Sequence, residues 1–467
     1  MVAAKERFGR MPRAIVMLVV LLGAAGAGQA ADRFVSTAGN DTANDCLSSA
    51  APCRTIPYAV TQSANGDTVK IAGGTYPGTV TIDFSTVLIV SGGWSGDFTG
   101  RDPVLNETIV RPPTSGVILA VDVFASFGEV IDVTLEGISF RGTGRLIETQ
   151  SGHTASVMLA VVNCSLKGAR CCPDAILAAS SGNSSTTISV ADSTISHFQN
   201  AIAVGSADAS SLALTVTNSL LSHNRGNGLG LGIGAFSDGS SALSISLSNS
   251  TVSGNGRGMN LVPLGTSSLT TDVTSSSFLR NRPGGGIYMR TLDSASLNLT
   301  LTNVALRSNR RSPSRLENPS IPPDGGAIFV DGASSLTLTN ATLSANRAVG
   351  EGGGIAARHG TVDLTNTILW RNKAASGADI HMEQSSPGLV VNADHCDIGD
   401  RVTVSGTFND LGGNINADPL LLGDFHLRAG SPCIDAGTCT GAPATDFEGD
   451  PRPTGAGCDM GADEFVP

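Results

Sequence analysis

Aromatic and charged side chains are scarce in this chain. Its 467 residues include two Trp, three Tyr and fifteen Phe, and 15% are charged. Sugar-binding sites commonly use aromatic rings, so few rings remain for one if several Phe fill an interior. The net charge is −11, and an acidic chain repels nucleic acid. We therefore expect no nucleic-acid partner, and acidic polysaccharides are disfavoured unless a local basic patch overrides the average.

Motifs of common enzymes are also missing. The sequence has no Gly-x-Ser-x-Gly, phosphate loop, Gly-x-Gly-x-x-Gly or His-Glu-x-x-His, and its seven His show no metal-ligand spacing. Glycoside hydrolysis needs two carboxylates at a defined separation. Five acids are near enough in sequence to converge but do not share a register, so we expect mostly solvated turn residues: Asp324, Asp331, Glu351, Asp363 and Asp379.

The first thirty residues contain the one long apolar segment. Four basic residues within residues 5–13 precede an apolar run over residues 14–25, and Gly28 and Ala30 suit a cleavage site. This pattern predicts a secretory signal peptide over 1–30, too short for a membrane span. We expect the mature chain to be secreted or at the cell surface, without a membrane span.

Nine cysteines are present, without Cys-x-x-Cys. Export favours disulfides over metal ligation. We predict the pairs Cys46–Cys53 and Cys439–Cys458. The pairing of the remaining cysteines stays open: Cys164, Cys171, Cys172, Cys396 and Cys433.

A repeat runs through the middle of the chain. Five copies read Asn-x-x-apolar-x-x-Asn and weaker copies begin with Gly, Asn, Asp or Ser, at intervals of about 26 to 37 residues. The first positions are Gly137, Asn163, Asp192, Asn218, Asn249, Ser275, Asn303, Asn340 and Asn366. A period in this range indicates stacked units that cannot bury a core alone.

Each copy has the pattern of short strands. Apolar residues two and four positions before the first Asn alternate with Ser, Thr or Asp, as in Leu299 and Leu301, which predicts strands with one buried face. Another apolar residue follows three positions after it. The fold class is therefore all-β, a right-handed parallel β-helix of about 26–31 residues per coil, with aligned asparagines and a C-terminal cap. A Pro-rich insertion over 312–323 explains the longest interval, and the intervals are too short for a propeller.

Three stretches resemble known families. Residues 34–76 and Gly92-Gly93-Trp94 look like the opening of exported β-helix proteins of the pectate-lyase-like superfamily. Phe278-Leu279-Arg280-Asn281 and Gly325-Gly326-Ala327-Ile328 resemble polymorphic outer-membrane protein repeats. Asn416-Ala417-Asp418-Pro419, Asp435-Ala436-Gly437 and residues 449–465 are similar to the choice-of-anchor Q domain. These resemblances imply a β-helix at the cell surface, in a superfamily that contains enzymes and non-enzymes.

The organisation expected is a signal peptide (1–30), an N-terminal cap with the first coils (31–130), β-helix repeats (131–410) and a choice-of-anchor Q-like region (411–467) that closes the open end. We expect a non-catalytic exported protein that acts in adhesion, polysaccharide binding or structure. The alternative is a polysaccharide lyase or glycoside hydrolase, which three acids grouped with a Lys or Arg on one open face would favour.

Few individual residues suggest a binding site. Trp370 follows interior Leu369 and is the aromatic residue that we expect to face a ligand, unless it is a partly buried cover. No cofactor is expected, apart from a weak Ca²⁺ hypothesis. Its candidate ligands, for which loop hydrogen bonds are the alternative, are Asp446, Asp450, Asp459 and Glu464.

Overall fold

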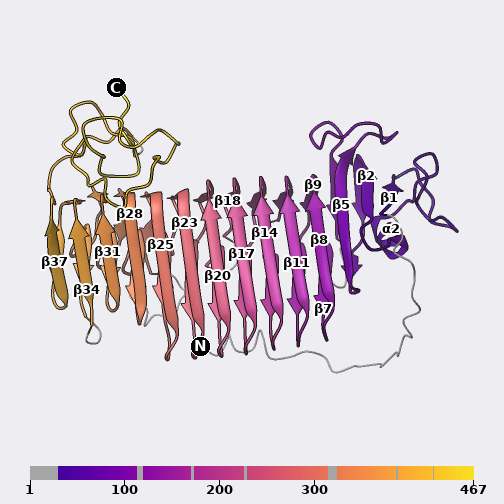
Figure 1. Cartoon of the computed structure of the whole chain (residues 1–467), viewed down its shortest axis with the longest axis horizontal. Helices are drawn as coiled ribbons and strands as arrows, with labels where there is room; N and C mark the ends of the chain where they lie inside the picture. Colours follow the sequence, from indigo (N-terminus) through magenta and orange to yellow (C-terminus); the bar gives the residue numbers. More distant parts are fainter. Residues whose placement is uncertain are drawn as a thin grey trace.

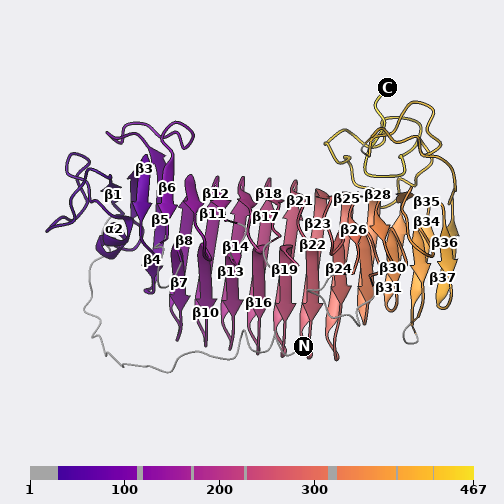
Figure 2. The same ribbon diagram turned by 180° about the vertical axis from the view of Figure 1, so that it is seen from behind.

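The computed structural model describes residues 30–112, 119–169, 173–225, 229–313, 323–384, 388–423 and 425–467. Almost all of the predicted signal peptide, and Cys171 and Cys172, lie outside these ranges. The described residues contain no helix long and apolar enough to cross a membrane. They form a parallel β-helix in which strands rise on one face and descend on the other, with right-handed progression (Figures 1 and 2).

Each full coil contains three strands that join two large sheets. The 23-stranded sheet contains the first strand of each coil and the short second strand, and the 12-stranded sheet contains the third. The first strands are β1 (Asp32–Val35), β2 (Thr68–Ala72), β5 (Thr86–Trp94), β8 (Val130–Glu136), β11 (Ser156–Val162), β14 (Ser185–Ala191), β17 (Ser211–Thr217), β20 (Ala242–Ser248), β23 (Ser268–Leu279), β25 (Ser296–Arg307), β28 (Ser334–Ser344), β31 (Thr361–Thr365), β34 (Val390–Asp394) and β37 (Thr407–Gly412).

The second strands follow a sharp corner, and in β23, β25 and β28 they merge with the first. The separate ones are β3 (Gly74–Pro77), β6 (Thr108–Arg111), β9 (Ile138–Arg141), β12 (Ser165–Lys167), β15 (Thr194–Ser196), β18 (Leu220–Ser222), β21 (Thr251–Ser253), β32 (Ile368–Trp370) and β35 (Asp397–Ile398). The third strands are β4 (Val80–Ile82), β7 (Val121–Ala125), β10 (Ile147–Ser151), β13 (Asp174–Ser180), β16 (Asn200–Ser206), β19 (Leu231–Ser237), β22 (Arg257–Pro263), β24 (Ile287–Arg290), β27 (Ile328–Asp331), β30 (Ile355–Ala357), β33 (Ile380–Met382) and β36 (Arg401–Thr403). A small third sheet pairs β26 (Arg310–Arg311) with β29 (Arg347–Ala348).

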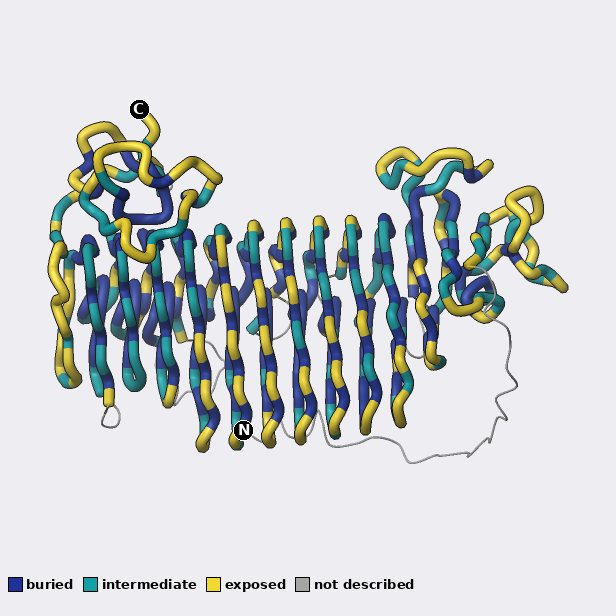
Figure 3. The backbone as a smooth tube through the Cα atoms, viewed as in Figure 1, coloured by how far each residue is buried: buried dark blue, intermediate teal, exposed yellow. Residues whose placement is uncertain are grey.

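The core is one apolar stack along the axis. Buried and exposed residues alternate along the first strands (Figure 3), as in β25, where Leu299 and Leu301 are at most 1% exposed and Asn298 is exposed. The apolar residues predicted three positions after each corner are all buried: Phe140, Leu166, Ile195, Leu221, Val252, Phe278, Leu306, Leu343 and Leu369. The predicted period and register are therefore confirmed.

The nine repeat positions are corners in left-handed backbone. Their φ angles lie between 43° and 64°, a region that Gly, Asn and Asp tolerate better than other residues. Successive corners stack, since the Asn218 N–H donates to the Ser248 carbonyl and the Asn249 N–H to the Thr274 carbonyl. The predicted row of aligned asparagines is confirmed.

The second asparagine of the repeat builds a buried amide ladder. Its members are Asn224, Asn255, Asn281, Asn309, Asn346 and Asn372. The Oδ1 of Asn346 accepts from the Asn309 backbone N–H and from Asn309 Nδ2, each at 3.0 Å, and Asn346 Nδ2 donates 2.8 Å to the Leu306 carbonyl. Each amide thus has hydrogen-bond partners inside the coil, which offset the free-energy cost of burying it.

The two ends of the stack are covered differently. Helix α2 (Ile56–Gln62) buries Ile56, Ala59 and Val60 at the N-terminal end. The C-terminal region lies over the corner of the last coils, while five of the six residues of β37, at the end of the stack, are exposed (Figure 1). The expectation that residues 411–467 close the open end is therefore corrected: the cap covers one side.

Corner asparagines anchor this cap. The Nδ2 of Asn303 donates to the Thr445 carbonyl at 2.7 Å, that of Asn366 to the Thr438 carbonyl at 2.7 Å, and that of Asn340 to the carbonyls of Asp459 and Gly461. Apolar contacts around Ile368, Leu427, Cys433 and Met460 complete the interface. The corner row therefore serves as a docking strip as well as a turn.

Candidate functional site

Basic residues follow the amide ladder on the outside of the stack. Arg282, Arg310, Arg347 and Lys373 each come directly after a ladder asparagine, and all four are exposed. We call these four residues the basic row. Arg310 pairs in register with Arg347, and Arg347 with Lys373. Neighbouring strands are roughly 4.8 Å apart, so the row places one cation per coil along the rod.

Within the described ranges, the basic row has no ion-paired counter-charges. None of its four members makes an ion pair with a described carboxylate. Like charges directly opposite each other on neighbouring strands are destabilising. An anionic group lying along the row would relieve this repulsion, and a chain of regularly spaced anions would do so in every coil.

Trp370 lines a cavity of about 260 Å³, whose lining includes no member of the basic row. Arg307 and Trp370 end strand segments two coils apart, and Ser344 pairs in register with both. Arg371 follows at the corner, and Arg428 approaches from the C-terminal region. The Trp370 side chain is half-buried against the apolar contacts of the cap and also lines this cavity. It therefore combines the two roles considered from the sequence, a cover residue and a ring facing a cavity.

A second cavity lies at earlier coils and shares Arg307 with the first. Its volume is about 210 Å³, and Arg280 and His223 also line it. Arg280 is exposed, and its backbone N–H donates to the Arg307 carbonyl in the next coil. We call the basic row together with Arg280, Arg307 and Arg371 the cationic corner; within it, Asp418 lies 3.9 Å from Arg371.

The four predicted calcium ligands lie in the C-terminal region. Asp446 Oδ1 accepts three backbone N–H groups, from Glu448, Gly449 and Asp450, and Asp459 accepts those of Asp435 and Phe465. Glu464 lies 3.4 Å from buried Arg452, whereas the Asp450 side chain is exposed. Burial raises the pKa of Asp459 and Glu464. Loop hydrogen bonds thus account for the buried carboxylates, and calcium binding stays a prediction.

Two of the five acids considered for catalysis converge. The Arg358 guanidinium lies 2.8 Å from Asp324 and 3.8 Å from Glu351, and 3.6 Å from a further acid, Glu383. His381, which the sequence did not single out, lies 3.0 Å from Glu351.

The other three acids have separate partners. Asp331 lies 3.5 Å from Arg290, Asp363 accepts from Asn392, and Asp379 accepts from Asn372 in the interior. Burial raises the pKa of Asp379. These three carboxylates do not join the Asp324–Glu351 group.

The cysteines have structural roles. The predicted pairs Cys46–Cys53 and Cys439–Cys458 are both disulfides. Cys164 and Cys396 are buried at corners next to the repeat position, where Ser193, Ser219 and Ser250 stand in other coils and accept a backbone N–H. Burial raises the pKa of the Cys164 and Cys396 thiols to about 12, so neither is a reactive thiolate at neutral pH.

The basic row had a signal in the sequence. Asn281-Arg282, Asn309-Arg310, Asn346-Arg347 and Asn372-Lys373 recur at one position of the repeat. The net charge of −11 is a sum over the whole chain, so it does not reveal a local row of cations. When the coils are aligned, the four cations fall at one position of the repeat, as the apolar residues do.

Comparisons with known proteins add little to this picture. No family model and no curated protein matches the chain. Among solved structures, the chain is similar to the crystal structure of pectate lyase Pel9A, with a TM-score of 0.42 and 14% identity over 94% of this chain and 98% of that one. The β-helix assignment rests on the chain's own parallel strand pairing. The resemblances to the choice-of-anchor Q domain and the outer-membrane repeats stay predictions.

Proposed function

We propose that this protein is an exported, non-catalytic β-helix that binds an acidic polysaccharide along its cationic corner. The observation that carries the proposal is the basic row, in which all four cations are exposed, three pair in register across strands, and none is paired with a described carboxylate. A linear polymer with one carboxylate per sugar presents anions at regular intervals, as the row presents cations. Arginine forks suit carboxylates because they donate two parallel hydrogen bonds.

The cavity at Trp370 supplies a second element of recognition. It is smaller than pockets for drug-sized ligands, so it suits a single sugar ring or its carboxylate. Trp370 offers an apolar ring face, and Arg307 and Arg371 offer positive charge, part of which Asp418 offsets from 3.9 Å away from Arg371. Export, which the first thirty residues predict, would bring the protein to extracellular polysaccharides.

The proposal is tested by affinity electrophoresis in gels that contain polygalacturonate, alginate or neutral dextran. We expect retardation by the acidic polymers alone, and weaker retardation as salt is raised.

The double variant Arg310→Gln/Arg347→Gln should weaken binding about tenfold or more, since contacts between charged groups contribute roughly 1.5–3 kcal/mol each. The matched control Arg54→Gln/Lys167→Gln removes two exposed cations elsewhere and should bind like the wild type. Equal retardation by dextran, equal loss in the control, or preferential binding of duplex DNA would overturn the proposal.

A carbohydrate-active enzyme is the second candidate. One observation favours it: Asp324, Glu351 and Glu383 surround Arg358. Three acids are thus grouped with a cation, although Asp324 is buried and does not lie on an open face. Release of reducing ends from the same polymers measures such activity. Activity that Glu351→Gln abolishes would establish this function in place of the non-catalytic one.

A further inference from the structure

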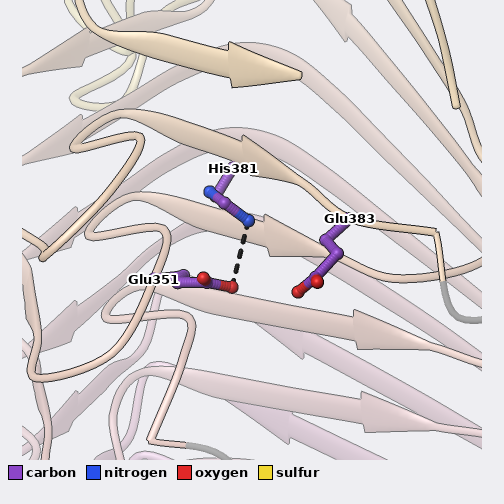
Figure 4. A group of neighbouring side chains, drawn as sticks. All are labelled: Glu351, His381 and Glu383. Atoms are coloured by element: carbon purple, nitrogen blue, oxygen red, sulfur yellow. Dashed lines mark ion pairs between the residues drawn. The ribbon is translucent and has the colours of Figure 1, made fainter. Parts of the chain in front are cut away.

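Glu351, His381 and Glu383 meet on the outside of the 12-stranded sheet, near its C-terminal end (Figure 4). Glu351 precedes β30, His381 is the middle residue of β33, and Glu383 follows β33. The neighbours of His381, Ile380 and Met382, are fully buried in the core. Because strand side chains alternate between faces, His381 points away from the core and toward the two glutamates.

Among the described residues, the buried side chain of His381 has no hydrogen-bond partner. Its exposed fraction is 3%, and neither ring nitrogen has a hydrogen-bond partner. Nε2 lies 3.0 Å from Glu351 Oε2, yet the geometry between them is not that of a hydrogen bond. A buried polar group without a partner is costly, so the arrangement requires an explanation.

A short distance between Nε2 and Oε2 without a hydrogen bond is typical of two ligands of one metal ion. Atoms that each lie roughly 2.1 Å from a shared ion, at tetrahedral or octahedral angles, are about 3.0–3.4 Å apart, and both lone pairs point at the ion. One ligand atom from each of Glu351, His381 and Glu383 lies within 4.8 Å of the others. The Glu383 side chain is 44% exposed, so little packing restricts its rotation toward an ion.

The local charge also favours a cation. Three carboxylates, those of Asp324, Glu351 and Glu383, surround one guanidinium, Arg358, whose 2.8 Å contact is with Asp324. Burial raises the pKa of Glu351, and the charges of Asp324 and Glu383 raise it further. A divalent ion would offset this repulsion.

We propose that Glu351, His381 and Glu383 bind a divalent transition-metal ion of the zinc class. One imidazole with two carboxylates suits zinc, whereas calcium takes six to eight oxygen ligands. Three protein ligands leave a coordination position open to water or a sugar oxygen. The site is separate from the basic row and does not depend on polysaccharide binding.

The test uses the full chain freed of metal with a chelator and titrated with Zn²⁺ alone in a calorimeter. We expect one ion per chain. His381→Ala and Glu351→Gln should each weaken binding at least tenfold, as should Glu383→Gln, a change at a half-exposed side chain that preserves folding. The control His395→Ala removes an imidazole paired with Asp394 and should bind like the wild type. Circular dichroism verifies that each variant is folded.

Two results would overturn this inference. One is the absence of stoichiometric Zn²⁺ binding by the wild type. The other is binding that survives Glu383→Gln and His381→Ala but is lost in His426→Ala, which would assign the ion to the group His426, Glu448 and Asp463. Neither result bears on retardation by acidic polysaccharides, so the two proposals fail independently.

Discussion

Arg310 and Arg347 pair in register in neighbouring parallel strands, so two exposed guanidinium groups lie one coil apart. Like charges opposite each other on neighbouring strands are destabilising, so we expect repulsion between them to lower the stability of the unliganded protein. Retaining such a pair is understandable if an anion binds there, since binding sites are often less stable than the scaffold around them.

Replacing one of these arginines should therefore stabilise the free protein. For Arg347→Gln we expect the free energy of unfolding to rise by up to about 1 kcal/mol at low salt, the range for charge pairs across strands. The gain should disappear at high salt. Thermal unfolding at two ionic strengths measures it.

Arg141→Gln provides the comparison for that experiment. Arg141 pairs with Glu107 on an exposed surface, so its loss should lower stability by up to about 1 kcal/mol. If the two variants shift the melting temperature in the same direction, the basic row is not a site of repulsion.

The core register predicts a large contrast within β25. Leu301→Asp places an unpaired charge in the dry interior and should cost more than about 4 kcal/mol, or prevent folding. Asn298→Asp adds the same charge on the exposed face of the strand and should change stability by no more than about 0.5 kcal/mol. Urea unfolding of both variants compares them. Similar losses would mean that the two side chains do not face opposite sides.

The sequence predicted the fold well because its signals are local. Leu299 and Leu301 alternate with polar residues, and Asn303 tolerates the left-handed corner, so the residues of each coil suffice to predict its strands and its turn. The position of the cap could not be predicted from neighbouring residues in the sequence. Asn340 bonds to carbonyls about 120 residues away, and nothing near Asn340 in sequence indicates that contact.

The candidate sites were harder to predict for the same reason. Glu351 and His381 come from successive coils, and their approach depends on the register between coils and on side-chain directions. Arg310 and Arg347 are 37 residues apart because of the Pro-rich insertion, which hides their equivalence in a fixed-period count. The Asn-Arg dipeptide was the usable signal.

Asp397 should make stability depend on pH. Burial, with help from Asp379 and Asp418, raises its pKa to about 6 in the folded chain, against an ordinary value of 3.8. The folded state therefore binds the proton more tightly than the unfolded state, and stability should fall as pH rises from about 4 to about 6. Asp397→Asn should flatten this slope and raise the melting temperature at pH 7.

Thermal melts across that pH range measure the effect. Asp463, whose pKa burial also raises to about 6, should leave part of the slope in the variant. Asp410→Asn, at an exposed position in β37, is the control and should retain the full slope. An unchanged slope in Asp397→Asn would show that Asp397 titrates alike in both states.

Asn340 and Asn249 allow the docking of the cap to be measured separately from the corner itself. Both are repeat asparagines with nearly equal φ angles, 50° and 47°. Asn340 donates to the carbonyls of Asp459 and Gly461 in the cap, whereas Asn249 is exposed. Replacing either with Ala removes the same preference for left-handed backbone. The difference between the variants therefore reports the hydrogen bonds to the cap together with the one that Asn340 Oδ1 accepts from Asn366 Nδ2. We expect Asn340→Ala to lower the free energy of unfolding by about 1–3 kcal/mol more than Asn249→Ala, because two carbonyls lose their donor.

Limited proteolysis should then cleave residues 413–467 faster in Asn340→Ala alone. Equal cleavage of the two variants would mean that the apolar contacts around Ile368 and Met460 hold the cap by themselves.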